Sequence, residues 1–203
     1  SPLRNWATGG TSKIGATERF PDPFSKLNAT EKACKLTCEA TIGPCHTESP
    51  ERQDISDGGD GIPLRRALRI VNTQCLPVAN ALVEIWHTNY TGGYSGDIQA
   101  MCSNNENDLD KQFFRGYQRT NAQGIVYFNT CYPGWYSSRA VHIHLRVQIG
   151  EYLPDDRAAS IVTTQLLFSD SLNHTIFSDT PLYQNLGVPD TTLETDNVVG
   201  GEE

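Results

Sequence analysis

Two histidines stand two residues apart in a stretch that alternates between apolar and polar side chains. Residues 140–149 read AVHIHLRVQI. Successive side chains of a β-strand point to opposite faces, so His142 and His144 would share one face with about 7 Å between their Cα atoms. Both imidazoles would then reach one first-row metal ion at about 2 Å. The same pattern also fits a solvent-facing strand that carries two histidines by chance.

Two tyrosines are placed where turns and loops would direct them toward this histidine face. Tyr136 follows Pro133 and Gly134, a pair that favours a turn just before the strand. Tyr94 lies in the glycine-rich loop 92–96, where the backbone has little steric restriction. Either tyrosine alone also fits an aromatic side chain that closes a loop, so the pair is informative only together with the histidines.

The rest of the sequence predicts short strands separated by long loops. Besides residues 140–149, the expected strands are 65–73, 81–87, 124–128 and 161–168. Helical periods are absent from the centre of the chain, whereas Asn28 would cap a short helix over residues 29–38. These features predict an all-β fold, a sandwich or a barrel, with irregular arms.

Composition restricts the partners of the chain. The 203 residues suit one domain and carry a formal net charge of −8, which argues against nucleic acid or anionic lipid as a partner. No apolar run reaches the roughly 18 residues that a membrane span requires. Composition therefore indicates an ordinary soluble globular protein.

The six cysteines indicate an oxidising compartment. They are even in number and do not follow a zinc-finger spacing, which favours disulfides. Acceptor sequons at Asn28, Asn89 and Asn173 and a start at Ser1 rather than Met agree with a processed, secreted glycoprotein. The spacing suggests pairs Cys102–Cys131, Cys45–Cys75 and Cys34–Cys38, out of about fifteen connectivities that six cysteines allow.

Taken together, these residues resemble the intradiol ring-cleavage dioxygenases, which include catechol and protocatechuate dioxygenases. The resemblance runs in order over residues 41–190 and is strongest to the secreted, single-domain members. It implies a β-sandwich catalytic domain at 41–190, between an arm with a short helix at 1–40 and an acidic tail at 191–203 that wraps the surface or frays. The matching motifs are Gly43-Pro44, 52–55, 61–64, 75–77, 83–88, 93–95, 114–116, 118–120, 133–136, 139–144 and 163–166.

The family resemblance implies a mononuclear non-haem iron(III) site. Tyr94 and Tyr136 match the two phenolate ligands, and His142 and His144 match the two imidazole ligands, with a solvent hydroxide as the fifth. Iron(III) is hard and highly charged, so it can hold a tyrosine deprotonated although the free side chain has a pKa of about 10. Tyr136 matches the axial tyrosine that leaves when a catecholate chelates the metal.

Further residues match the substrate side of the family's site. Arg139 matches the arginine that stabilises negative charge on the substrate ring, and Gln165 matches the polar group beside it. After Gly43-Pro44 the chain carries Cys45 and His46 where many members carry aromatic residues. His46 is therefore expected to face the substrate, and the preferred catechol is left open.

Other polar residues are assigned structural roles. His87 is interpreted as a satisfied core or edge histidine rather than a ligand. Arg52, Asp54 and Arg115 are interpreted as a buried ion-pair network.

The expected reaction is cleavage of catechol-type diols by O2 between the two hydroxyl-bearing carbons, with cis,cis-muconate-type products. Two alternatives remain at this stage. A cupin-like barrel would also use a His-x-His site, but Gln148 stands where a cupin carries an acid. A non-enzymatic prealbumin-like or carbohydrate-binding β-module would fit residues 77–83. The helical dimerisation region of intracellular catechol dioxygenases has no counterpart, so a monomer is expected.

Overall fold

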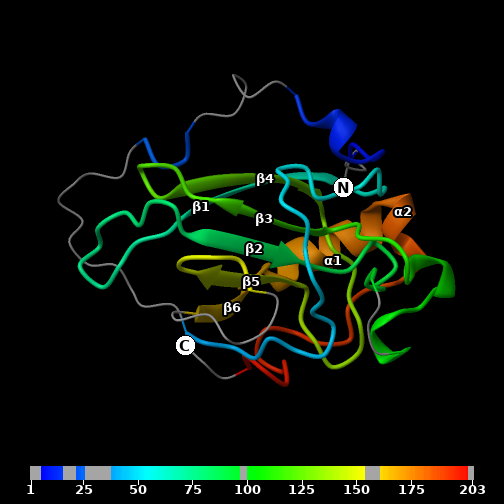
Figure 1. The fold of residues 1–203 in the computed structure, drawn as a ribbon. Coiled ribbons are helices and arrows are strands. Elements are labelled where there is room, and N and C mark those ends of the chain that lie inside the picture. Colours follow the sequence, from blue (N-terminus) through cyan, green and yellow to red (C-terminus); the bar gives the residue numbers. More distant parts are fainter. Residues whose placement is uncertain (1–5, 16–21, 26–37, 97–99, 154–160, 201–203) are drawn as a thin grey trace.

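Two antiparallel sheets form the body of the molecule (Figure 1). The computed structural model describes residues 6–15, 22–25, 38–96, 100–153 and 161–200. β1 pairs with β4, and the larger sheet has the order β3-β2-β5-β6. The strands are β1 (Pro63–Arg69), β2 (Leu82–Trp86), β3 (Arg115–Arg119), β4 (Ile125–Cys131), β5 (His142–Gln148) and β6 (Ile161–Leu167).

The two sheets pack face to face around one apolar core, which confirms the predicted β-sandwich. Alternate residues of β2 and β5, including Ile85 and Ile143, point inward against residues of β1 and β4 such as Leu68 and Phe128. Burying one such side chain contributes about 1.5–3 kcal/mol. Because neighbouring side chains alternate, the intervening residues of β2 and β5 point to the outer face of the larger sheet. Every strand except β3 overlaps a stretch for which the sequence predicts a strand.

Two helices close one end of the sandwich (Figure 1). They are α1 (Asp170–Asp179) and α2 (Pro181–Gln184), and the short 3-10 helices are η1 (Thr11–Lys13), η3 (Ala100–Cys102) and η4 (Glu106–Asp108). Ile176, Phe177 and Tyr183 pack against Val141 at the start of the β5 segment. The sequence does not predict α1, and the helix expected over residues 29–38 lies outside the described residues, apart from its last residue. Within the described part of the chain, no helix has the length and apolarity to cross a membrane.

The sequon at Asn173 is unsuited to carry a glycan in the folded protein. Asn173 lies in α1 and is 3% exposed. Its carbonyl accepts a hydrogen bond from the Tyr132 hydroxyl at 2.6 Å, and its amide donates to the Phe168 carbonyl at 3.3 Å. An N-linked glycan requires a surface position, so this sequon does not support the expectation of a glycoprotein.

The predicted disulfide pairs are wrong. Cys45 is bonded to Cys102, and Cys75 is also disulfide-bonded. Cys131 is a buried free thiol, and Cys38 is an exposed one. The expectation paired Cys102 with Cys131 across one loop, whereas the fold brings the 38–50 segment across the sheet to meet the loop that follows β2. The pairing thus depends on a contact between segments that are far apart in the sequence.

We expect the Cys45–Cys102 bond to stabilise the fold, because it closes a loop over a sequence separation of 57. The chain-entropy relation gives about 4 kcal/mol for a loop of this length. Replacing both cysteines by serine should lower the free energy of unfolding by up to that amount, measured by denaturant titration. Cys38→Ser, which removes a free exposed thiol, is the control and should leave the free energy unchanged. Equal stability of the double variant and the wild type would contradict the expectation.

Candidate metal-binding site

His142 and His144 lie on the outer face of β5 and are nevertheless buried, at 4% and 3% exposure. The alternative of a solvent-facing strand is therefore wrong. In the sheet, His144 stands between Trp86 of β2 and Gln165 of β6. The Trp86 ring stacks on the His144 imidazole at 4.7 Å and an interplanar angle of 3°. This stacking fixes the plane of the imidazole and directs its Nε2 atom.

Four side chains converge on one point at this face. The Nε2 atoms of His142 and His144 lie 3.1 Å apart. The Tyr94 hydroxyl lies 3.0 Å from His144 Nε2, and the Tyr136 hydroxyl lies 3.2 Å from His142 Nε2. The loop after β2 supplies Tyr94, and the turn before β5 supplies Tyr136. The structure thus brings together all four side chains that the sequence proposes as ligands.

The spacing of these four atoms fits a metal ion. Two ligands that lie about 2.0–2.1 Å from one ion, at an angle of about 90–100°, are about 2.8–3.2 Å from each other. His142 Nδ1 lies 2.6 Å from the Ala140 carbonyl and donates to it, which leaves the Nε2 lone pair for an ion. Among the described residues, no group of three or more His, Cys, Asp or Glu side chains has metal-binding geometry. The two tyrosines are therefore needed to complete a ligand set here.

Burial keeps His142, His144 and Tyr94 neutral when no cation is bound. It lowers the pKa of His142 to about 4 and that of His144 well below its usual 6.5, and for His144 the neighbouring His142 lowers it further. Burial, assisted by Tyr136, raises the pKa of Tyr94 well above 10. Neutral imidazoles are the form that binds metals. A highly charged cation would supply the interaction that favours tyrosinate over tyrosine.

A buried arginine holds the Tyr94 loop in place. Arg115 of β3 is fully buried and donates hydrogen bonds to the carbonyls of Ser95 and Cys45 at 2.6 Å and 2.8 Å. Its guanidinium lies 5.7 Å from the centroid of the Tyr94 ring. The expectation that Arg115 belongs to an ion-pair network with Arg52 and Asp54 is therefore wrong. The hydrogen bonds of Arg115 go to backbone carbonyls that border the site.

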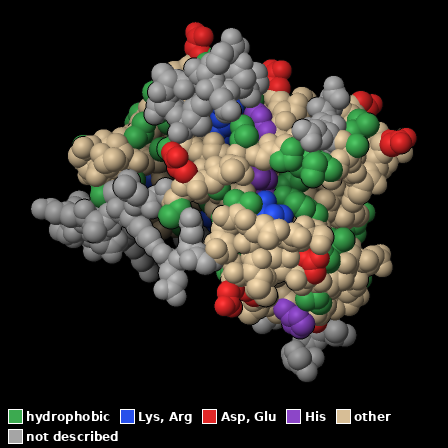
Figure 2. Space-filling model, turned by 90° about the horizontal axis from the view of Figure 1, so that it is seen from below, with side chains coloured by type: hydrophobic (Ala, Val, Ile, Leu, Met, Phe, Trp, Pro, Cys, Tyr) green, Lys and Arg blue, Asp and Glu red, His purple; other side chains and the backbone are tan. Residues whose placement is uncertain are grey.

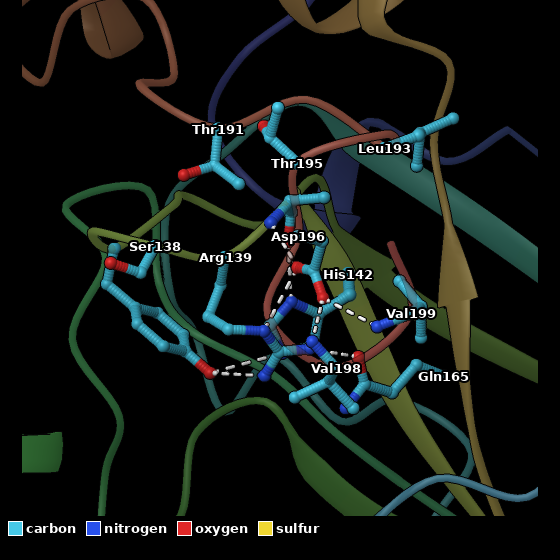
Figure 3. Close-up of polar contacts among 12 residues, drawn as sticks. Ser138, Arg139, His142, Gln165, Thr191, Leu193, Thr195, Asp196, Val198 and Val199 are labelled. Carbon is cyan, nitrogen blue, oxygen red and sulfur yellow. Dashed lines mark hydrogen bonds and ion pairs between the residues drawn. The ribbon is translucent and has the colours of Figure 1, made fainter. Parts of the chain in front are cut away.

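Arg139 and Gln165 lie beside the four donors, as the sequence predicts. Arg139 Nη2 donates to Gln165 Oε1, and Nη1 lies 3.5 Å from the Tyr136 hydroxyl. A third partner, Asp196, binds Arg139 Nε at 3.0 Å (Figure 3). Nothing in the sequence marks Asp196, because the tail is expected to wrap the surface or fray and nothing local links residue 196 to residue 139. At Asp196 the tail is buried rather than frayed.

His46 lies close to the site but faces a carboxylate. Its Nε2 is 3.1 Å from Glu84 Oε1, and its ring meets the Trp86 ring edge-on at 4.7 Å. Trp86 thus contacts both His46 and His144. The role of His46 in substrate binding stays a prediction.

The surroundings of the donors are apolar on one side. Trp86 and Tyr94 form a buried cluster with the Cys45–Cys102 disulfide, and Ile42 and Tyr136 pack against it. Figure 2 shows one face of the molecule on which histidine and basic side chains lie among hydrophobic ones near the centre. An apolar aromatic molecule would meet compatible surfaces next to the donor set.

Known proteins share this fold and these motifs. A family profile described as "Dioxygenase" matches residues 41–171. An intradiol ring-cleavage dioxygenase from Tetranychus urticae is 32% identical with a TM-score of 0.67, over 81% of this chain and 79% of that one. The dioxygenase domain of a dioxygenase–carbohydrate-binding fusion from Streptomyces sp. SirexAA-E is 27% identical with a TM-score of 0.51, over 66% and 75% of the two chains.

A more distant structure supports the fold alone. Hydroxyquinol 1,2-dioxygenase from Pseudomonas putida DLL-E4 is 22% identical with a TM-score of 0.52, over 70% of this chain and 51% of that one. Among curated proteins, no sequence gives a significant match.

The matched segment and the fold place this chain in a family of dioxygenases. It belongs to the intradiol ring-cleavage dioxygenases, a family that cleaves catechol-type rings and generally uses non-haem iron(III). Membership confirms the resemblance seen in the sequence and rules out a cupin-like barrel.

The interpretation of His87 as a satisfied core histidine agrees with the structure. His87 is fully buried, and its Nδ1 donates to the Thr88 carbonyl at 2.7 Å. Its Nε2 therefore accepts from the Thr130 hydroxyl, also at 2.7 Å. Burial lowers its pKa to about 3.

This buried histidine should make the protein sensitive to acid. The unfolded chain binds a proton on His87 near pH 6.5, whereas the folded chain does so only near pH 3. Stability is therefore full above pH 6.5 and falls as the pH drops through this window, by up to about 1.4 kcal/mol per pH unit. His87→Gln should remove that part of the slope in urea titrations across the window. The exposed His174→Gln is the control and should keep it. An unchanged slope in His87→Gln would contradict the assignment.

Proposed function

We propose that this protein cleaves catechol-type diols with O2 at one iron(III) ion per chain, between the two hydroxyl-bearing carbons. The observation that carries the proposal is the convergence of two imidazole nitrogens and two tyrosine oxygens at 3.0–3.2 Å. Two phenolates and two neutral imidazoles suit a hard trivalent ion. When bound, iron(III) supplies the positive charge that stabilises tyrosinate and catecholate oxygens and makes the diol ring reactive toward O2.

The two tyrosines are held differently, which assigns them different roles. Tyr94 is buried at 2% exposure, and Arg115 holds its loop through the Ser95 carbonyl. Tyr136 is only partly buried and sits in a turn where Ser138 has a φ of +69°. Tyr136 is thus the side chain that can move away when substrate arrives. An incoming diol hydroxyl would take the position that the Tyr136 oxygen leaves. As a phenolate, Tyr136 would then be the nearby base that takes the proton of this hydroxyl.

Arg139 and Gln165 face the place where the ring would acquire negative charge. The guanidinium has five N–H donors and no acceptor, so it can bind an anionic ring but cannot bind a metal. Gln165 Nε2 is buried without a hydrogen-bond partner among the described residues, and it is therefore free to donate to substrate. Fixed donors aimed at developing charge lower the barrier of the chemical step.

The cellular setting is part of the proposal. We propose a secreted monomer whose partners are small catechols and O2. The Cys45–Cys102 disulfide supports an oxidising compartment.

The metal assignment predicts about one iron per purified chain and a visible tyrosinate-to-iron absorption. Tyr94→Phe, His142→Ala and His144→Ala each remove one of the four converging donors and should lose most of the iron and of the colour. His174→Ala, an exposed histidine on α1, is the matched control and should keep both. Zinc in the metal analysis, or full iron content in the His142 and His144 variants, would contradict the assignment of iron to these four donors.

The reaction assignment predicts different outcomes for the two residues beside the metal. Arg139→Ala should keep the iron and its colour and lower turnover by about 10²–10³, the usual effect of removing one charge-stabilising donor. Arg119→Ala, an exposed arginine on β3, is the control. Tyr136→Phe should alter the visible spectrum and slow diol binding.

Product analysis tests the position of cleavage. With ¹⁸O2 and catechol, the expected product is a cis,cis-muconate that contains both labelled atoms. A yellow semialdehyde from cleavage outside the diol, or full turnover by Arg139→Ala, would show that the site works differently.

A further inference from the structure

The C-terminal segment reaches the site through one buried carboxylate. Asp196 Oδ2 accepts hydrogen bonds from Arg139 Nε at 3.0 Å and from the Ala140 amide at 2.6 Å (Figure 3). The Asp196 side chain has no exposed surface, and that of Arg139 is 12% exposed. A charged pair in this position is screened little by solvent, so removing one partner leaves an unpaired buried charge.

The second carboxylate oxygen is bound by the segment itself. Asp196 Oδ1 accepts from the amides of Val198 and Val199 at 2.8 Å and 2.9 Å. Burial alone would raise the pKa of Asp196, but these two amides, the Ala140 amide and Arg139 outweigh it and lower the pKa. Four N–H groups therefore fix the orientation of the carboxylate, and the chain folds around it.

A carboxylate fixed in this way also fixes the guanidinium. The five N–H donors of arginine form a rigid planar fork, so a partner at Nε sets the directions of the other two nitrogens. With Nε bound to Asp196, Nη2 is directed to Gln165 and Nη1 to the Tyr136 hydroxyl. The contact of Nε with Asp196 therefore determines the orientation that the proposed function requires of the other two nitrogens.

We propose that Asp196 is a positioning residue that holds Arg139 in the orientation needed for ring cleavage. The proposal rests on the proposed function, since it assigns the part of the site that orients its charge-stabilising arginine. Asp196 lies outside the residues 41–171 that match the family profile. The C-terminal segment is thus a structural part of the active site rather than a surface appendage.

Asparagine is the sharpest substitution, because it keeps the shape but offers a single acceptor oxygen. Its NH2 group must face either the Arg139 side or the Val198 and Val199 amides, so one pair of N–H groups loses its acceptor, and in both placements Arg139 loses its charged partner. We expect Asp196→Asn to keep the iron and the visible spectrum. Turnover should fall by about 10- to 100-fold, because a misplacement near 1 Å can cost that much. The falls in kcat and in kcat/KM should be similar, as for an interaction made in the transition state. Glu194→Gln, an exposed acid in the same segment, is the matched control and should behave as wild type.

A double-variant comparison separates positioning from stability. In an Arg139→Ala background, Asp196→Asn should cause no further loss per iron-loaded chain, because the residue through which it acts is gone. Asp196→Glu keeps the charge but moves the carboxylate, so it should fold well and still turn over slowly. The crystal structure of iron-loaded Asp196→Asn should show Arg139 turned away from Gln165. This readout does not depend on activity.

Each result decides the proposal. Wild-type turnover in Asp196→Asn, an equal loss in the Arg139→Ala background, or an Arg139 that keeps its contact with Gln165 despite lower turnover would overturn it. If the wild-type chain cleaves no catechol, the proposed function fails instead, and the crystal structures still decide whether Asp196 orients Arg139.

Discussion

The structure depends on bringing four donor atoms together, with successive ones 3.0–3.2 Å apart, in a place from which water is largely excluded. The lone pair of His142 Nε2 faces His144 Nε2 at 3.1 Å, because His142 uses its Nδ1 proton on the Ala140 carbonyl. His144 Nδ1 is buried and has no hydrogen-bond partner among the described residues. Such a cluster is costly to bury without a cation. The surrounding structure must therefore hold each donor firmly.

Three buried groups hold the donors in place, and they come from different parts of the chain. Trp86 stacks on His144 from the neighbouring strand, and Arg115 holds the Tyr94 loop from β3. The Cys45–Cys102 bond joins the two segments that border Tyr94. Each support is buried, and one of them, Arg115, is charged where an apolar side chain would have been the simpler choice. A core designed for stability alone would not contain a buried guanidinium whose Nη1 has no partner among the described residues.

The two histidines of the candidate site and the strand that carries them could be predicted from the sequence, because period-two alternation is a local property. His142 and His144 differ from the apolar residues between and beside them, and this contrast is visible without a structure. β3 escaped prediction because Arg115, Gly116 and Gln118 carry none of the branched or aromatic character that marks a strand. α1 escaped prediction because its polar residues, such as Asn173, are buried by tertiary contacts and break the expected amphipathic pattern.

The long-range contacts could not be derived from the sequence. Cys45 meets Cys102, and Asp196 meets Arg139, only because the chain crosses the sheet and returns to it. Spacing along the chain carries no information on such meetings. For the cysteines it favoured pairs that the fold does not make.

The reactivity of the free thiol of Cys131 can report how often the sheet formed by β1 and β4 opens locally. Cys131 ends β4 opposite Pro63 of β1 and has no exposed surface, and burial raises its pKa to about 12. The thiolate is the nucleophile that attacks a thiol reagent, so Cys131 can be modified only while the pairing of β1 and β4 at this edge of the sandwich is transiently open. The exposed Cys38 reacts without such a step. The difference between the modification rates of Cys38 and Cys131 therefore measures how often this edge opens in the unaltered chain, without an added label.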